Sequence, residues 1–232
     1  MTIKHFFFDK NCYIDKALSN RQYLENKLTE QDIKFSNILF LNQIHGNQVF
    51  VVDDKSKIYG NQNLIKADGI VTNLKNIAIA VVTADCAPII MYDEINNIIS
   101  ATHSGWRGSL SNIVDNTIFE MIKLGAKSEN IIAHIGPMIH KESYQVQDDF
   151  YDNFINQDLK YLKFFSRQAN NKDGYLFDLS MFLYEKIKNH NVKKIHKSTV
   201  NTYENKKYSS YRRSCHLNES ECGRNISLAV IN

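Results

Sequence analysis

Apolar residues recur three and four positions apart in three segments, which predicts amphipathic helices. The segments begin near residue 19, near residue 111 and at Asp178, and a fourth helix is predicted over 148–155. In the second segment Gly125 provides a C-terminal stop. Its predicted buried face consists of Val114, Ile118, Met121 and Ile122.

Short runs of β-branched and aromatic residues lie between these helices and predict at least seven strands. The runs are 38–41, 48–52, 69–72, 77–83, 89–92, 98–102, 131–135 and 226–231. Several, notably 77–83, are apolar at consecutive positions, which is typical of strands buried on both faces. The strands come in consecutive groups, so we expect a layered α/β or α+β fold and no strictly alternating Rossmann arrangement.

The chain of 232 residues has no repeat of 20–50 residues and no linker rich in Pro, Gly or Ser, so we predict a single domain over 1–232. Its 43% hydrophobic and 23% charged residues are typical of a globular protein and exclude a disordered one. No apolar run approaches the roughly 18 residues of a membrane span, and the run 6–8 is too short for a signal peptide. We expect a cytoplasmic protein with no membrane partner.

The basic residues are scattered, which argues against a nucleic-acid partner despite a net charge of +3. Only six of the 28 basic residues are arginines, and four of these lie in the same few short segments as the single tryptophan, Trp106. These segments are where we expect chemistry. The four arginines are Arg107, Arg212, Arg213 and Arg224.

Two histidines and a cysteine lie at the ends of predicted strands, where loops can bring them together. Cys86 follows Asp85 after the run 77–83, His103 ends another strand, and His45 precedes a third. Two imidazoles and a thiolate are good zinc ligands, and three protein ligands leave the fourth tetrahedral position open. The spacing matches no compact metal motif. From these residue types alone, a buried structural cysteine and hydrogen-bonded histidines remain the alternative.

Other residues near the predicted strand ends suggest anion and base binding. Gly105 and Gly108 flank Arg107 in a turn before a helix, an arrangement that favours a phosphate. The same turn is also compatible with Trp106 in the core and an arginine paired to a carboxylate. Tyr144 offers a ring on which a base stacks, or simply packs.

Each of the remaining candidates likewise has a functional and a structural interpretation. Arg212 and Arg213 form a second anion-binding cluster or a solvated basic loop. Asp68 orients a ligand or completes the turn before the run 69–72. The set Cys215, His216 and Cys222 lacks a fourth ligand, so we interpret it as incidental.

Taken together, several motifs resemble those of the laccase-domain, or polyphenol-oxidase-like, family, which is interpreted as a family of zinc-dependent purine nucleoside phosphorylases. The motifs occur in the family's order from about residue 42 to residue 224. This chain departs from the family in its shorter N-terminal region, its longer link between Arg213 and Gly223, and Asn201 where many members have cysteine. The motifs are NQIHG, ADGIVT, ADCAPI, ATHSGWRG, IGPMI with SYQV, FDL, and SYRR with GR.

The resemblance implies a four-layer α/β/β/α sandwich with mixed sheets, an α+β fold. It implies Zn2+ as cofactor, with His45, Cys86 and His103 as ligands. The implied activity is phosphorolysis of adenosine, inosine and S-methyl-5'-thioadenosine, together with deamination of adenosine. A purine nucleoside and phosphate are therefore the expected partners, and the preferred nucleoside and the oligomeric state stay open.

Residue chemistry assigns roles within this hypothesis and supplies its rivals. We expect Arg107 and the glycine turn to hold phosphate, and Asp85 to support the neighbouring ligand or to carry a proton. The first rival is a zinc-free cysteine hydrolase with Cys86 as nucleophile and His103 as base. Copper-dependent phenol oxidation and a non-catalytic nucleoside-binding module are the others. Multicopper chemistry needs many histidines around several metals, which this sequence does not suggest.

Overall fold

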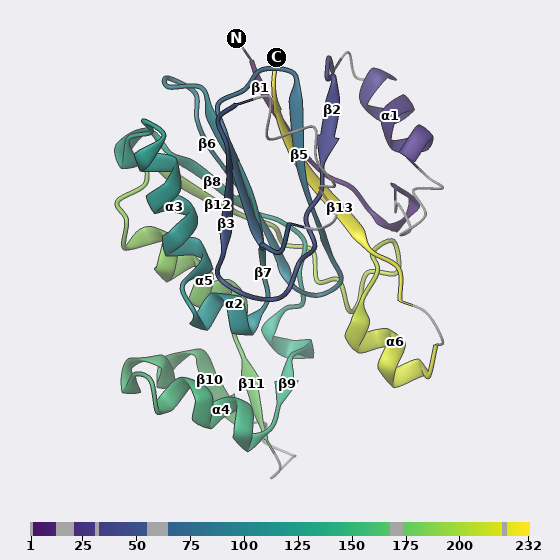
Figure 1. Cartoon of the computed structure of the whole chain (residues 1–232). Helices are drawn as coiled ribbons and strands as arrows, with labels where there is room; N and C mark the ends of the chain where they lie inside the picture. The colour runs from purple at the N-terminus through teal and green to yellow at the C-terminus, as the bar shows by residue number, and fades with distance from the viewer. Residues whose placement is uncertain (1, 13–20, 31–32, 55–64, 168–173, 220–221) are drawn as a thin grey trace.

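Two β-sheets lie face to face at the centre of the molecule (Figure 1). The computed structural model describes residues 2–12, 21–30, 33–54, 65–167, 174–219 and 222–232. The four-stranded sheet has the order β1 (Ile3–Phe7), β13 (Asn225–Ile231), β5 (Ile77–Thr83) and β2 (Asn37–Leu39). The six-stranded sheet has the order β12 (Lys194–Lys197), β8 (Ile132–Ile135), β6 (Ala87–Asp93), β7 (Ile98–Ser104), β4 (Gly69–Thr72) and β3 (Val49–Val52). Both sheets contain parallel and antiparallel pairs.

Helices cover the outer faces of both sheets and complete four layers (Figure 1). α1 (Arg21–Glu30) covers the four-stranded sheet, while α3 (Ile113–Lys123) and α5 (Leu179–Lys188) lie on the other side of the six-stranded sheet. Each of the three interfaces between layers has its own hydrophobic cluster. The predicted α+β class and the α/β/β/α layering are therefore confirmed.

Strand β5 shows why the run 77–83 is continuously apolar. Side chains alternate between the faces of a strand. Ala78 and Ala80 pack toward α1, whereas Ile77, Ile79 and Val81 pack between the two sheets. Both faces are buried, as the sequence predicts, and the small alanines leave room for the helix.

A smaller subdomain of strands and helices packs below the helical layer of the six-stranded sheet (Figure 1). Its three-stranded sheet has the order β10 (Phe165–Arg167), β11 (Tyr175–Phe177) and β9 (Gln145–Val146). It packs with α4 (Asp148–Ile155) through aromatic rings, for example Phe154 against Phe177 at 4.7 Å between centroids. α6 (Tyr211–Leu217) follows a long loop and precedes β13.

The helix predicted to begin near residue 111 is present as α3, which starts at Ile113. The chain forms a short helix α2 (Trp106–Leu110) first, and Asn112 then adopts the left-handed conformation (φ 71°) before α3 begins. Ile122, predicted to be buried, is 42% exposed. The C-terminal stop is confirmed, because Gly125 has φ 112° and Ala126 donates its N–H to the carbonyl of Met121.

The described structure leaves the start of the first predicted helix open, since residues 19 and 20 lie outside the described residues. From residue 21 onward that helix is present, and its Leu24 and Leu28 are buried. Among the described residues, no helix combines the length and apolar character that crossing a bilayer requires.

Three neighbouring histidines connect the two sheets, one pair tilted and the other stacked. His5 of β1 lies 4.2 Å from His134 of β8, and His134 lies 4.4 Å from His196 of β12, measured between ring centroids. Burial, followed by the charges of His5, His196 and Lys194, lowers the pKa of His134 to about 4. Burial and the charge of His196 lower the pKa of His5.

We predict that these three histidines make the fold less stable in acid. A histidine with a lowered folded pKa stabilises the fold fully above its unfolded pKa of about 6.5, and this stability is lost as the pH falls toward 4. Between pH 7.5 and pH 5, the free energy of unfolding should therefore fall by about 1 kcal/mol less in His134→Gln than in the wild type. Urea unfolding at both pH values measures this difference, and parallel losses in the two proteins would contradict it.

Candidate metal centre

Four neighbouring strands of the six-stranded sheet begin or stop at the same end of the sheet, and the predicted ligands lie at this end. β6 and β7 are antiparallel, with Pro88 opposite His103, so Cys86 lies just before the start of β6 and beside the end of β7. β4 pairs with β7 so that Gly69 faces Thr102, and this places Asp68 beside His103. The β3 strand runs parallel to β4, which brings the preceding loop with His45 to the same place.

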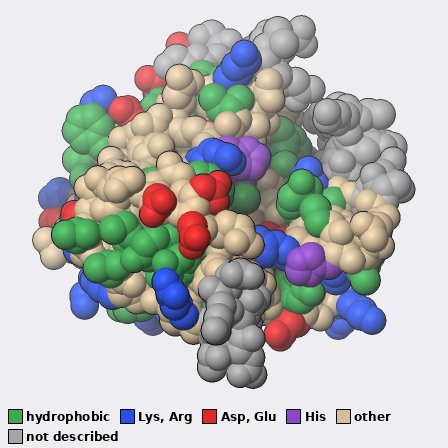
Figure 2. Space-filling model, turned by 90° about the horizontal axis from the view of Figure 1, so that it is seen from below, with side chains coloured by type: hydrophobic (Ala, Val, Ile, Leu, Met, Phe, Trp, Pro, Cys, Tyr) green, Lys and Arg blue, Asp and Glu red, His purple; other side chains and the backbone are tan. Residues whose placement is uncertain are grey.

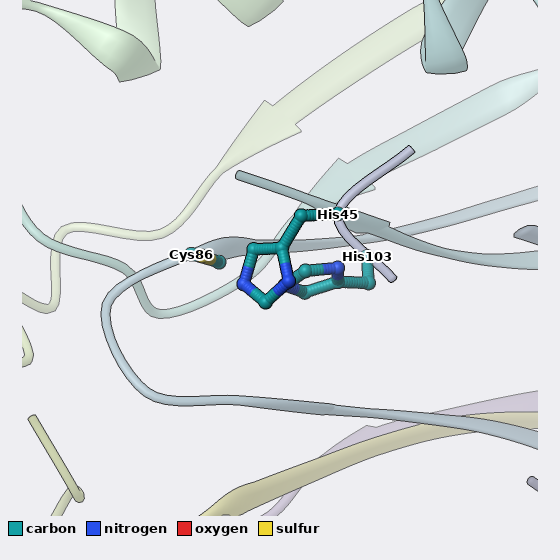
Figure 3. A group of neighbouring side chains, drawn as sticks. All are labelled: His45, Cys86 and His103. Carbon is teal, nitrogen blue, oxygen red and sulfur yellow. The ribbon is translucent and has the colours of Figure 1, made fainter. Parts of the chain in front are cut away.

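The side chains of His45, Cys86 and His103 converge from these three segments (Figure 3). Their ligand atoms all lie within 4.8 Å of one another, and they are the one such group of metal-ligating side chains found among the described residues. His103 is 3% exposed, Cys86 is half-buried and His45 is exposed. The site is therefore anchored at depth and open to solvent on the His45 side.

Gly105 leaves the space that the ligands occupy. A Cβ atom at this position would lie 2.9 Å from the Cys86 sulfur and 3.3 Å from a ring carbon of His45. At Gly108 a Cβ would lie 2.7 Å from the carbonyl oxygen of Gly46. These close approaches give both glycines a steric reason, because any side chain would push α2 away from the ligands.

Asp68 organises both His103 and the loop of His45. This fully buried carboxylate lies 2.8 Å from Nδ1 of His103 and accepts hydrogen bonds from the backbone N–H groups of Ile44, His45 and Gly46. Because an ionised carboxylate only accepts, His103 donates from Nδ1 to Asp68, so Nε2 is the nitrogen that a metal would bind. The structure thus places the Asp68 carboxylate where it orients His103, in keeping with one of the two roles that the sequence allows for it.

Gln43 is a supporting residue that the sequence argument missed. Its side-chain amide donates to the carbonyl of Val82 at 2.7 Å and accepts from the N–H of Val82 at 2.8 Å. The amide thus imitates a paired strand residue and ties the His45 loop to β5. His45 itself has φ 58°. The only sequence signal for this role is the position of Gln43 two residues before the histidine.

The electrostatics of the site favour a thiolate. Burial raises the pKa of the Cys86 thiol, but the charge of His103 and hydrogen bonds from His103 and His45 outweigh it and lower the pKa to about 6. Burial lowers the pKa of His103, while Cys86 and Asp68 raise it, to about 9 overall. Burial raises the pKa of Asp68, but hydrogen bonds from His103, Gly46 and Ile44 lower it overall.

Tyr144, Arg107 and Arg212 form a second group of predicted residues, and the charge of Cys86 acts on the Tyr144 hydroxyl. Burial and the charges of Cys86 and Asp85 raise the pKa of Tyr144 against the opposing effects of Arg212 and Arg107, so its hydroxyl stays protonated. The Arg212 guanidinium lies over the Tyr144 ring, 5.6 Å from its centroid. Arg107 is exposed and lies 4.4 Å from the Trp106 ring centroid. Figure 2 shows a hollow on this face, with a histidine and basic side chains at its rim.

Arg213 and Asp85 have structural partners. The Arg213 guanidinium donates to the backbone carbonyls of Thr202, Tyr203 and Tyr208, so three of its five N–H donors are bound within the protein. Both carboxylate oxygens of Asp85 accept hydrogen bonds, from Thr202, Ser210 and the N–H of Arg212.

The C-terminal cysteines form no described metal site. Cys215 and Cys222 are free thiols, and His216 is hydrogen-bonded to the hydroxyl of Tyr203 at 3.0 Å. Within the described residues this set is absent from any close group of metal ligands.

The sequence matches a family model over most of its length. The chain belongs to the family whose model is described as multi-copper polyphenol oxidoreductase laccase, and that model matches residues 14–232.

Curated relatives carry a different name from that of the family model. A Rickettsia conorii protein named purine nucleoside phosphorylase is 38% identical over 232 residues, which cover 98% of this chain and 93% of that protein. A Haemophilus influenzae protein of the same name is 32% identical over 193 residues, 82% of this chain and 72% of that protein.

Solved structures share the fold. A Bacillus licheniformis hypothetical protein matches with a TM-score of 0.85 and 21% identity over 99% of this chain and 93% of its own. A Neisseria meningitidis protein matches with a TM-score of 0.82 and 24% identity over 99% of this chain and 94% of its own.

Proposed function

We propose that this protein is a zinc-dependent purine nucleoside phosphorylase that acts on adenosine, inosine and S-methyl-5'-thioadenosine and also deaminates adenosine. The observation that carries the proposal is the convergence of His45, Cys86 and His103 at an open site bordered by arginines. The names of the relatives support the reaction class.

The three side chains fit a zinc ion by their chemistry. Two imidazoles and one thiolate supply three of four tetrahedral ligands, and the carboxylate behind His103 is the second partner that metal-bound histidines ordinarily have. A zinc ion there would supply Lewis-acid chemistry to a phosphate or water oxygen. The exposure of His45 leaves a path for such a ligand to enter.

Phosphate recognition falls to Arg107 and Arg212, whose charges both act on the Tyr144 hydroxyl. Guanidinium groups bind phosphate oxygens with paired hydrogen bonds. Arg212 lies over one face of the Tyr144 ring. We therefore assign Tyr144 the role of a hydrogen-bond donor through its protonated hydroxyl, in place of the base stacking expected from the sequence.

The reaction then follows from positioning. A phosphate oxygen held by the arginines forms a bond to the anomeric carbon while the bond from that carbon to the purine nitrogen breaks. The electron pair of the broken bond leaves with the purine, which takes up a proton. Deamination of adenosine uses water instead of phosphate. The water oxygen forms a bond to C6 of the purine while the bond from C6 to the amino nitrogen breaks, and the amino group takes up a proton from the water and leaves as ammonia.

Two rivals have a specific observation in their favour. Without metal, Cys86, His103 and Asp68 line up as a nucleophile, a base and an orienting carboxylate, which is the arrangement of a cysteine hydrolase. One cysteine and two histidines also bind copper in electron-transfer sites. A multicopper oxidase, in contrast, needs many histidines around several metals, and among the described residues this group contains two.

Product analysis on purified protein tests the proposal. With inosine, we expect hypoxanthine and ribose 1-phosphate only when phosphate is present, and about one zinc ion per chain. Base release without phosphate, or binding without any product, would contradict it. Turnover in metal-free protein with covalent capture of Cys86 would support the hydrolase, and bound copper with an intense visible absorption would support the oxidase.

A further inference from the structure

Asp85 is held in an unusual conformation by its surroundings. It is a non-glycine residue with φ 80°, lies in the turn between β5 and β6, and is 9% exposed. A left-handed conformation costs an ordinary residue free energy, so the contacts of Asp85 must hold it there.

The carboxylate of Asp85 fixes the beginning of α6. Oδ2 accepts from the backbone N–H of Arg212 at 2.7 Å and from the Ser210 hydroxyl at 3.0 Å. Ser210 is the N-cap of α6, and its hydroxyl in turn accepts from the N–H of Arg213. Oδ1 accepts from the buried hydroxyl of Thr202 at 2.7 Å. Both oxygens thus have donors that belong to the protein.

The backbone of Asp85 holds the segment that leads to Tyr144. Its carbonyl accepts from the N–H of Ile139 at 3.0 Å. One residue earlier in that segment, Met138 accepts from the N–H of Thr202, and further along Ser143 accepts from the side chain of Asn201. The Cys86 turn, the Tyr144 segment and the start of α6 are therefore joined at Asp85.

Arg212 depends on this junction for its place. Its backbone N–H is bound by Asp85, and its guanidinium donates to the carbonyl of Gln145 at 2.7 Å while lying over Tyr144. The residue next to the cysteine ligand thus determines where the guanidinium lies relative to that ligand.

We propose that Asp85 is a positioning residue that fixes Arg212 against Tyr144 beside Cys86 and so sets the affinity for phosphate, without transferring a proton. This inference rests on the proposed function and deepens it, since it assigns phosphate binding to a wall of the site that Asp85 assembles. Thr202 and Ser210 act in the same assembly.

Steady-state kinetics of Asp85→Asn test the proposal. The amide cannot accept from all three donors, so we expect the KM for phosphate to rise about tenfold while kcat changes less than about threefold. The pH profile of kcat and the zinc content should match the wild type. In an Arg212→Met background, Asp85→Asn should raise the KM no further, because the guanidinium it positions is gone.

Several results would overturn the proposal. A fall in kcat of about 100-fold or more with the loss of one limb of the pH profile would identify a proton carrier. A lower melting temperature with unchanged KM and kcat would identify a merely structural residue. Additive effects of Asp85→Asn and Arg212→Met would also contradict positioning.

Two arms keep the test decisive. If Asp85→Asn fails to fold, Thr202→Val removes one donor with little change in shape and should raise the KM for phosphate about threefold. Calorimetric titration of zinc-loaded protein with inorganic phosphate should show the same ratios between dissociation constants. Wild type that binds phosphate without cleaving nucleosides would refute the proposed function alone, whereas equal phosphate affinity in wild type and variants would refute the role of Asp85.

Discussion

Cys86→Ala should lose zinc and reduce phosphorolysis at least about 1000-fold while the protein stays folded. The thiolate is the only anionic ligand of the three, so its removal leaves two neutral imidazoles, one of them exposed. The fold should tolerate the change because Cys86 is half-buried in a turn and contributes little to the core clusters. Metal analysis, circular dichroism and the inosine assay on the same preparation measure all three effects.

Cys215→Ala is the matched control for this prediction. Cys215 is an exposed free thiol on α6 and has no place in the ligand group, so the variant should retain both zinc and activity. Normal turnover by Cys86→Ala would show that the reaction does not depend on the proposed metal ligand.

Asp68→Asn should weaken zinc binding by about 10- to 100-fold and also lower stability by about 2–4 kcal/mol. The asparagine amide would present N–H donors toward some of the groups that now donate to the carboxylate, namely Nδ1 of His103 and the N–H groups of residues 44–46. His103 would lose the partner that fixes its tautomer, and the His45 loop would lose its anchor. Competition with a chelator measures the affinity, and urea unfolding measures the stability.

Asp93→Asn separates the two effects of the Asp68 change. Asp93 is also fully buried and accepts backbone N–H groups of Ile95, Asn96 and Lys127, but it lies at the end of β6 away from Cys86. Its loss should lower stability by a comparable amount and leave zinc affinity unchanged. Equal zinc affinity in Asp68→Asn and the wild type would mean that Asp68 serves the fold alone.

Much of the layering is predictable because it depends on local patterns. The continuously apolar run 77–83 predicts a strand buried on both faces, and β5 has small residues toward α1 and large ones toward the second sheet. The positions of His45, Cys86 and His103 at strand ends also predict that loops can gather them. The order of the strands in each sheet decides that they do gather, and no local pattern carries that order.

The residues that the sequence argument assigned least well are those whose roles depend on distant partners. Arg213 and Arg212 are neighbours of the same type, yet one binds three backbone carbonyls and the other reaches Tyr144. Gln43 pairs with Val82, 39 positions away. The break between α2 and α3 depends on the left-handed conformation of Asn112. Asparagine is a common residue in this chain, so its presence at position 112 does not mark a break.

X-ray absorption at the zinc edge tests the central claim most directly, because it reports the ligands of the metal in the intact protein. We expect one sulfur at about 2.3 Å and two imidazole nitrogens at about 2.0–2.1 Å, with a light atom in the remaining position. The sulfur contribution should be absent from any zinc that remains in Cys86→Ala. A shell of oxygen and nitrogen alone in the wild type, with unchanged phosphorolysis, would contradict it.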